Sequence, residues 1–278
     1  MANHPFRTCI SHMATLPDFQ DPPVDEVVLG VQFEPPAAYT SVVAGKIWDL
    51  FRDEFPLVNE VPRLEPQFEV FGGNPTPGFQ LSFGVGPLRS RLWFISADES
   101  HLLQFQEDRF FLNWRKRPNG SISGLPYPRY EQISSTFRHK ISLLDDFFRD
   151  YFGSGLKITQ AEASYFNVMP MEDFSSVGKI FSFLKAETLN LDGFATNLVE
   201  IISNAEGHPH ARGFYESQSL LTPDGQKLAR LGLTVRGKPA GEDLAAGLSF
   251  IDDARLNIIL KFCDLTTPEA HEKWGRQT

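Results

Sequence analysis

Cysteine and long apolar runs are both scarce in this sequence. It has only two cysteines in 278 residues, Cys9 and Cys263, so it lacks the closely spaced set that a disulfide framework or a thiolate metal site needs. No apolar run approaches the roughly 20 residues of a membrane-spanning helix, and residues 1–12 lack the apolar core of a signal peptide. We therefore expect a cytoplasmic protein without membrane contact.

Positive charge is also in short supply. The chain has 26 lysines and arginines against 35 aspartates and glutamates, which gives a net charge of -9. A protein that coats nucleic acid generally needs the opposite balance, because basic side chains must replace the counterions of the phosphates. The composition therefore argues against nucleic acid as the main partner but leaves room for a local basic patch.

Phenylalanine is abundant, and its 25 residues recur at strand and helix spacings, which indicates a core between a sheet and its helices. A strand followed by a helix occurs once in each half: residues 26–33 lead to a helix around Trp48, and residues 158–168 lead to one around Phe181. Further antiparallel strands and a long amphipathic helix follow each time. We predict an α+β fold of two similar halves, each strand-helix-antiparallel sheet-long helix, resembling a tandem helix-grip arrangement.

The predicted boundaries follow the turn and linker residues. Residues 1–24 form a disordered leader, in which the part before Met13 is an upstream mis-start or an extension. The first half covers residues 25–155 and closes on Gly153-Ser154-Gly155, which fits a glycine C-cap and a short linker. The second half covers residues 156–278. So short a linker favours tight packing of the two halves.

The middle of the first half alternates between interrupted and regular stretches. Where prolines and glycines interrupt the pattern, we predict short strands at residues 68–71 and 79–83. Residues 88–116 predict an antiparallel meander, because polar turns separate three strand-like runs. In its last strand alternate residues share a face, with Phe110, Leu112 and Trp114 on one side and Phe111, Asn113 and Arg115 on the other.

The densest mixture of charged and aromatic residues covers residues 105–117 and continues at residues 127–131. Arginines that alternate with aromatic rings can hold phosphates or stack on bases. The same arginines can instead form internal ion pairs with Glu107, Asp108 and Glu131, and we favour this structural interpretation. The candidate binding residues in these stretches are Arg109, Asn113, Trp114, Arg115, Tyr127, Arg129 and Tyr130.

Patterns that carry catalytic or metal chemistry are weak. The histidines of His208-Pro209-His210 are too few for a zinc site, and Asp145 and Asp146 are adjacent on a helix and so point in different directions. Glycine-rich turns such as Gly84-Val85-Gly86-Pro87 precede strands, whereas a phosphate loop opens onto a helix. No serine or cysteine stands in a nucleophile motif. We predict no catalytic residue, no metal and no cofactor, and the sequence does not support an enzyme.

Three blocks of the sequence carry a resemblance to known proteins. They are residues 23–33 (PVDEVVLGVQF), residues 103–110 (LQFQEDRF) with Asn113-Trp114-Arg115 and residues 127–131 (YPRYE), and residues 264–269 (DLTTPE) with Trp274-Gly275-Arg276. In these blocks the chain resembles a sporadically distributed family of uncharacterised prokaryotic proteins of similar length. The resemblance implies no known activity, cofactor or catalytic residue. Sporadic distribution is typical of mobile or defence-linked genes, so it implies a role in conflict between host and mobile elements.

We therefore predict a cytoplasmic binding or interaction module, linked to that conflict, whose partner is an unknown small ligand or protein. In a helix-grip fold the gap between sheet and helix is often a ligand cavity, which supports a small ligand by analogy. Two alternatives stay open. One is a nucleic-acid-associated defence or regulatory component that uses the face with arginines and aromatics, and the other is a hydrolase or nuclease with dispersed catalytic residues. The sequence also leaves open a homo-oligomer.

Overall fold

The computed structural model describes residues 16–72, 90–116, 124–185 and 188–277, and its centre is a single antiparallel sheet. In this part of the chain nine strands lie in the order β2-β3-β4-β5-β1-β6-β9-β8-β7, so that β1 and β6 pair near the middle and β2 and β7 form the edges. The strands are β1 (Val24–Phe33), β2 (Leu57–Pro62), β3 (Ser90–Ile95), β4 (His101–Gln106), β5 (Arg109–Arg115), β6 (Ile158–Met171), β7 (Ala195–Ser203), β8 (Pro209–Leu221) and β9 (Lys227–Gly237).

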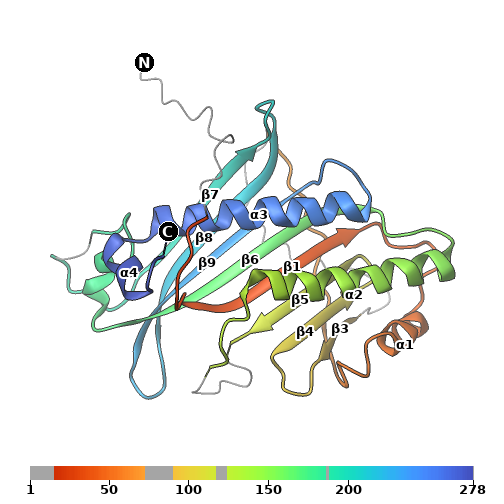
Figure 1. Cartoon of the computed structure of the whole chain (residues 1–278), viewed down its shortest axis with the longest axis horizontal. Helices are drawn as coiled ribbons and strands as arrows, with labels where there is room; N and C mark the ends of the chain where they lie inside the picture. The colour runs from red at the N-terminus through yellow and green to blue at the C-terminus, as the bar shows by residue number, and fades with distance from the viewer. Residues whose placement is uncertain (1–15, 73–89, 117–123, 186–187, 278) are drawn as a thin grey trace.

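Two long helices cover one face of the sheet (Figure 1). α2 (Arg129–Phe152) packs against β5, and α3 (Leu244–Leu265) packs against β6, β9 and β1. We call the covered side the helix face and the opposite side the back face. No helix in the described part of the chain combines the length and the hydropathy needed to cross a membrane. The short helices are α1 (Ser41–Asp49), the 3-10 helix η2 (Phe174–Lys179) and α4 (Pro268–Lys273).

Strand alternation sends the large apolar side chains of the central strands to the helix face. In β1, Val27, Leu29 and Val31 are completely buried, and β5 and β6 place apolar residues beside them. α2 ends as predicted at Gly153, whose left-handed backbone (φ 80°) suits a glycine C-cap. Before that point, α2 meets the sheet with the stripe that its three- and four-residue spacing predicts, formed by Ile133, Phe137, Ile141, Leu144 and Phe148.

The α+β class is confirmed, but the predicted two similar halves in a tandem helix-grip arrangement are wrong. The strands belong to one continuous sheet, because β1 pairs with β6 from Val24 opposite Asn167 to Phe33 opposite Ile158. The α-helix predicted around Phe181 is instead the six-residue η2. β1 is apolar on both faces, which suits a central strand, but this pattern does not tell which strand will pair with it. The predicted boundary at residue 155 lies between α2 and β6, two elements of this same body.

An irregular segment, residues 63–71, crosses the back face and is called here the back-face strap. It begins beyond β2, contacts Gln106 in β4 through Leu64, and reaches Arg212 in β8 through Val70. The short strand predicted at residues 68–71 is therefore wrong, because side chains and not a strand ladder hold this segment. The strand predicted at residues 79–83 lies outside the described residues.

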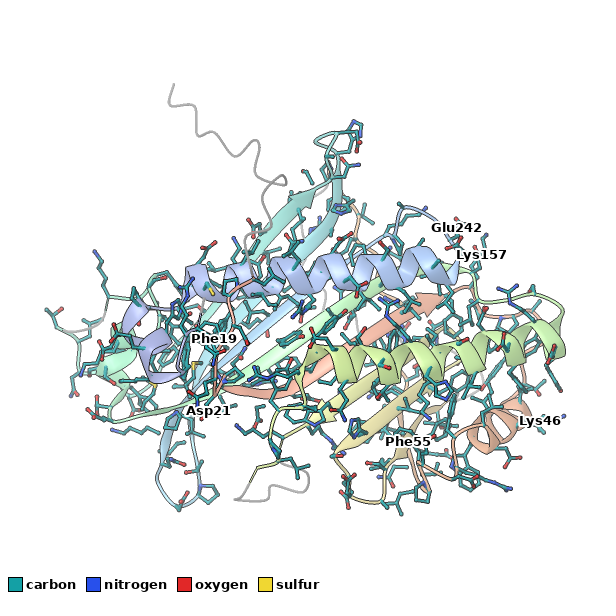
Figure 2. The ribbon with its side chains drawn as sticks, viewed as in Figure 1. Phe19, Asp21, Lys46, Phe55, Lys157 and Glu242 are labelled. Carbon is teal, nitrogen blue, oxygen red and sulfur yellow. The ribbon has the colours of Figure 1, made fainter. Side chains whose placement is uncertain are left out.

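Residues 16–22, the N-terminal strap, lie against the C-terminal end of the chain. The amide of Gln20 donates to the carbonyl of Gly275 at 3.0 Å, and the amide of Asp21 donates to that of Trp274 at 3.1 Å. Phe19 is buried, and Figure 2 shows it close to the C-terminal part of α3. The described part of the predicted leader is thus packed on the fold, and residues 1–15 lie outside the described residues.

Candidate functional site

The seven candidate binding residues do not form one surface. Strand alternation and the position of α2 divide them between the two faces of the sheet. Three project from β5 to the back face, namely Arg109, Asn113 and Arg115. The other four lie on the helix face, namely Trp114, Tyr127, Arg129 and Tyr130.

Arg109 is part of the protein interior. Its side chain is only 2% exposed, and its Nε donates to Asp108 Oδ1 at 3.1 Å. Its Nη2 donates to the carbonyl of Glu65 in the back-face strap at 3.0 Å. This is an internal ion pair of the kind that the structural interpretation of this stretch predicts.

Asn113 and Arg115 are also engaged by their neighbours. Asn113 Nδ2 donates to Glu26 Oε1 at 2.7 Å, and its Oδ1 accepts a hydrogen bond from Gln104 at 2.6 Å. Arg115 Nη2 donates to the carbonyl of Glu99 at 2.9 Å, in the turn between β3 and β4. The two side chains therefore join neighbouring strands and turns on the back face.

A cavity of about 450 Å³ lies on the helix face, and three of the candidate residues line it: Tyr127, Arg129 and Tyr130. Its walls come from the start of α2, the second half of α3, β6, β9 and the N-terminal strap. Natural pockets for small ligands have volumes of about 300–1,000 Å³, so this cavity is large enough for such a ligand. We call it the helix-face cavity.

One side of the helix-face cavity is apolar. Ile258, Ile259 and Phe262 project from successive turns of α3, and Leu233 faces them from β9. Phe19 of the N-terminal strap packs edge-on against Phe262, with ring centres 5.7 Å apart. This wall can bury hydrocarbon but offers it no polar partner.

The other side is polar and is built on β6. Tyr165 and Asn167 project two residues apart, and both are almost completely buried. The Tyr165 hydroxyl is buried too, yet it has no hydrogen-bond partner in the part of the chain that the structure describes. Burial, and to a smaller extent the neighbouring Tyr127, raises the pKa of Tyr165 well above its usual value, although the two hydroxyls do not reach hydrogen-bonding geometry. Tyr165 is therefore a neutral donor that has no acceptor in hydrogen-bonding geometry among the described residues.

Arg255 brings positive charge to the mouth of the cavity. Its guanidinium group lies over the ring of Tyr130, and its Nη2 is 3.7 Å from Glu131 Oε1. Its Nε is buried and has no hydrogen-bond partner among the described residues. Burial, followed by the nearby Asp252 carboxylate, raises the pKa of Tyr130, whose hydroxyl donates to Asp252 Oδ1 at 2.5 Å. The Arg255 Nε–H group is therefore available to a ligand, whereas the Tyr130 hydroxyl is already engaged with Asp252.

Arg129 closes the cavity by holding the N-terminal strap. Its Nη1 donates to the carbonyl of Phe19 at 2.9 Å and to Asp18 Oδ1 at 3.1 Å. Arg129 has a positive φ of 71°, a left-handed conformation that costs a residue with a Cβ about 1–2 kcal/mol. Such strain persists only where surrounding contacts fix it, and the contacts with the strap do so here.

Trp114 supports the cavity without lining it. Its side chain is buried beneath the start of α2, and its ring centre lies 5.4 Å from that of Tyr127. This contact fixes the orientation of the Tyr127 ring beside Tyr165. Trp114 is therefore a positioning residue and not a direct ligand contact.

The described residues contain no metal site, because no three His, Cys, Asp or Glu side chains are grouped there to hold an ion. His208 lies in the turn before β8, and His210 Nδ1 lies 3.2 Å from the carbonyl of Ile202 in β7. Asp145 binds Arg149 Nη2 at 2.8 Å and the amide of Leu156, so it caps the end of α2.

No family model matches the sequence, and no curated protein is detectably similar to it. The resemblance to the sporadic prokaryotic family therefore stays a prediction. The geometry of the helix-face cavity is the main structural indication of a function.

Several residues of this cavity were not predicted from the sequence. Tyr165, Asn167, Arg255 and Phe19 come from three separate elements, and no spacing along the chain joins them. One signal was present: Tyr165 and Asn167 continue the inward positions that alanines occupy earlier in the same strand. Large polar side chains at the inward positions of a central strand indicate a polar site inside the fold.

Proposed function

We propose that the chain is a binding module that holds a small amphipathic ligand in the helix-face cavity. The ligand places an acidic or hydrogen-bond-accepting group against Tyr165 and Arg255, and an apolar part against the α3 wall. This is the small-ligand form of the binding module predicted from the sequence. The cytoplasmic location, the link to host–mobile element conflict and a homo-oligomer remain predictions beside it.

The single observation that supports this proposal most strongly is the Tyr165 hydroxyl. A buried hydroxyl without a partner costs a protein about 1–3 kcal/mol, and nearly all buried polar groups in folded proteins avoid this cost. Tyr165 lines a cavity large enough for a ligand. An acceptor on the ligand would remove the cost and so contribute to binding.

The acidic character of the ligand follows from Arg255. Hydrogen bonds between a guanidinium group and a carboxylate or phosphate are roughly twice as strong as those between neutral groups. Arg255 lines the cavity with a free buried Nε, and its nearest carboxylate, Glu131, is 3.7 Å away and largely exposed. A surface pair of this kind is worth only about 0–1 kcal/mol. An acid bound inside the cavity can therefore compete with Glu131.

Native mass spectrometry is the first experiment for this proposal. The protein is purified gently from its native host and weighed before and after denaturation. An additional small mass that is lost on denaturation, and that belongs to an amphipathic acid, supports the proposal. In parallel, 8-anilinonaphthalene-1-sulfonate serves as a fluorescent probe that decanoate should displace. A bare chain that also binds neither the probe nor decanoate would contradict the proposal.

The nucleic-acid alternative loses its structural support. It uses the arginines of β5 as a docking face, but Arg109 is buried in its pair with Asp108 and Arg115 is bound to a turn carbonyl. Charge reversal at Arg109 is therefore expected to damage the fold and not a docking surface. The alternative of a hydrolase or nuclease with dispersed residues stays a prediction.

A further inference from the structure

A second, smaller cavity of about 150 Å³ lies on the back face, beside the back-face strap. Two glutamines of the sheet hold the strap there. Gln106 exchanges two hydrogen bonds with the backbone of Leu64, both at 2.9 Å. Gln32 does the same with Gln67, at 3.0 and 3.1 Å. Because each amide matches the donor and the acceptor of one strap residue, the strap is fixed over the sheet and the cavity has a defined wall.

Three arginines from different strands line this back-face cavity: Arg91 in β3, Arg109 in β5 and Arg236 in β9. Two of them already have counterions. Arg109 pairs with Asp108 at 3.1 Å, and Arg236 Nη2 pairs with Glu69 of the strap at 2.7 Å. Their positive charges are therefore neutralised inside the protein.

Arg91 differs from these two. Its Nη1 donates to the amide oxygen of Gln104 at 2.8 Å, but no carboxylate forms an ion pair with it in the described ranges. Its Nε is buried and lacks a hydrogen-bond partner there. Burial, and then the charge of Arg109, lowers the pKa of Arg91, because both disfavour a cation at this position. Among the described residues, Arg91 is thus a cation beside a polar cavity without a carboxylate that pairs with it.

The polar groups around Arg91 are arranged in a fixed chain. Gln104 accepts from Arg91 and donates to Asn113 at 2.6 Å, and Asn113 donates to Glu26 at 2.7 Å. The carboxyl group that lines the cavity belongs to Glu162, and burial raises its pKa although Arg236 is nearby. Glu162 Oε2 also lies 3.5 Å from Arg236 Nη1, and this ion pair balances its charge.

We propose that the back-face cavity binds a phosphate group, either as free phosphate or as the head of a phosphate ester, with Arg91 as its principal ligand. Guanidinium groups are the preferred donors to such anions, because several N–H groups in one plane can meet two oxygens. Arg91 is the arginine of this cavity that has a buried N–H group without a partner among the described residues, so it can donate to an oxygen of the anion. This site lies on the opposite face of the sheet from the helix-face cavity and does not depend on it.

Calorimetric titration with inorganic phosphate tests the proposal, with chloride used to keep the ionic strength constant. The protein with its natural sequence should bind one phosphate per chain, and Arg91→Gln should weaken the affinity at least about tenfold. The matched control is Arg230→Gln. Arg230 is on the same face, stacked over Phe166 at 4.4 Å, and does not line the cavity. The Arg230→Gln variant loses the same charge as Arg91→Gln and should bind phosphate like the unchanged protein.

A second titration with ribose 5-phosphate separates the two sources of the phosphate group. Tighter binding of the ester than of free phosphate, with the same loss in Arg91→Gln, identifies the head of a larger ligand. Equal or weaker ester binding identifies free phosphate. Absence of saturable binding of both compounds would overturn the proposal, as would an equal loss in Arg91→Gln and Arg230→Gln. Circular dichroism of each variant shows that any loss comes from a folded protein.

Discussion

The guanidinium group of Arg255 on α3 lies over the ring of Tyr130 on α2, 4.5 Å from the ring centre. This contact joins the two long helices at the mouth of the helix-face cavity. Cation–π contacts of this kind are worth about 0.5–2 kcal/mol, depending on their exposure. It also fixes the position of Arg255, whose buried Nε has no hydrogen-bond partner among the described residues. In the proposed function, Arg255 therefore contributes both to helix packing and to ligand recognition.

Replacing Arg255 should distinguish charged from neutral ligands. Arg255→Gln is expected to weaken decanoate binding about tenfold or more, because a charge-assisted hydrogen bond is worth about 1.5–3 kcal/mol. The uncharged analogue 1-decanol should bind almost as before. Displacement of 8-anilinonaphthalene-1-sulfonate measures both affinities. Arg138→Gln is the control, since Arg138 pairs with Asp252 outside this cavity. Equal losses for acid and alcohol would show that Arg255 acts only through helix packing.

Removing Arg129 should release the N-terminal strap. Arg129→Ala loses the hydrogen bonds to Asp18 and to the carbonyl of Phe19, so the strap should open more often. If the free energy of opening the strap falls by about 1 kcal/mol, the protected amides should exchange roughly fivefold faster. Hydrogen-exchange mass spectrometry over Gln20 and Asp21, whose amides donate to the C-terminal segment, measures this directly. Unchanged exchange in the variant would mean that the C-terminal contacts alone hold the strap.

Lys140 on α2 is a buried cation that pairs with the carboxylate of Glu54. Its Nζ lies 2.5 Å from Glu54 Oε1, and its side chain is 3% exposed. Glu54→Gln leaves this charge without a counterion and should cost about 1–3 kcal/mol of unfolding free energy, at the lower end because Glu54 itself is largely exposed. Lys140→Met replaces the cation with an apolar chain of similar length and should be close to neutral. Urea unfolding of the two variants tests this order, and a larger loss in Lys140→Met would contradict it.

His271 on α4 should make stability fall in mild acid. Its Nε2 is 2.7 Å from Thr266 Oγ1, which itself donates to the carbonyl of Phe262, so Nε2 must carry the proton. Arg276 Nη1 approaches Nδ1 at 3.1 Å, which leaves Nδ1 as an acceptor. Burial, followed by the charge of Arg276, lowers the pKa of His271. The native state thus favours the neutral imidazole.

The sign of the pH dependence follows from this lowered pKa. Above the unfolded pKa of about 6.5, His271 is neutral in both states and its full contribution is present. As the pH falls through that value the unfolded chain takes up a proton first, so the contribution is lost. His271→Gln keeps a donor and an acceptor but does not titrate, so its unfolding free energy should fall less from about pH 7.5 to about pH 5.5. Parallel losses in both proteins would mean that another group, such as the partly buried His101, causes the effect.

The sequence predicted the local elements well because their signals are local. The apolar stripe of α2, its glycine end at Gly153 and the alternation in β5 all depend on residues within a few positions of one another. The pairing of β1 with β6 joins strands far apart in the chain. β1 reads as an apolar run and β6 mixes apolar with polar residues, and neither pattern says which strand it will pair with, so the single sheet was mistaken for two halves.

The sequence predicted only part of the candidate site, because local spacing shows which neighbours along the chain lie together but not which distant elements meet. Tyr127, Arg129 and Tyr130 stand close together in the sequence and do line the helix-face cavity. Arg109 was grouped with them by composition, but strand alternation places it on the other face of the sheet. Tyr165 and Arg255 reach the cavity from β6 and α3, which only the tertiary fold brings beside α2.

The Tyr165 hydroxyl gives the central claim its sharpest test. Tyr165→Phe removes a donor that has no partner in the described structure, so it should leave the unfolding free energy unchanged within about 0.5 kcal/mol or raise it. Tyr215→Phe is the matched control, because Tyr215 is buried to a similar extent as a residue but its hydroxyl donates to Glu200 Oε2 at 2.7 Å. Loss of this hydrogen bond should lower the unfolding free energy by about 1 kcal/mol.

The deciding measurement compares the two variants in urea unfolding and in decanoate binding. The account predicts that Tyr165→Phe keeps its stability and loses about tenfold in affinity, whereas Tyr215→Phe loses stability and keeps its affinity. If Tyr165→Phe instead loses stability and binds decanoate as the unchanged protein does, then its hydroxyl serves the fold, and the helix-face cavity is not a ligand site of the kind proposed.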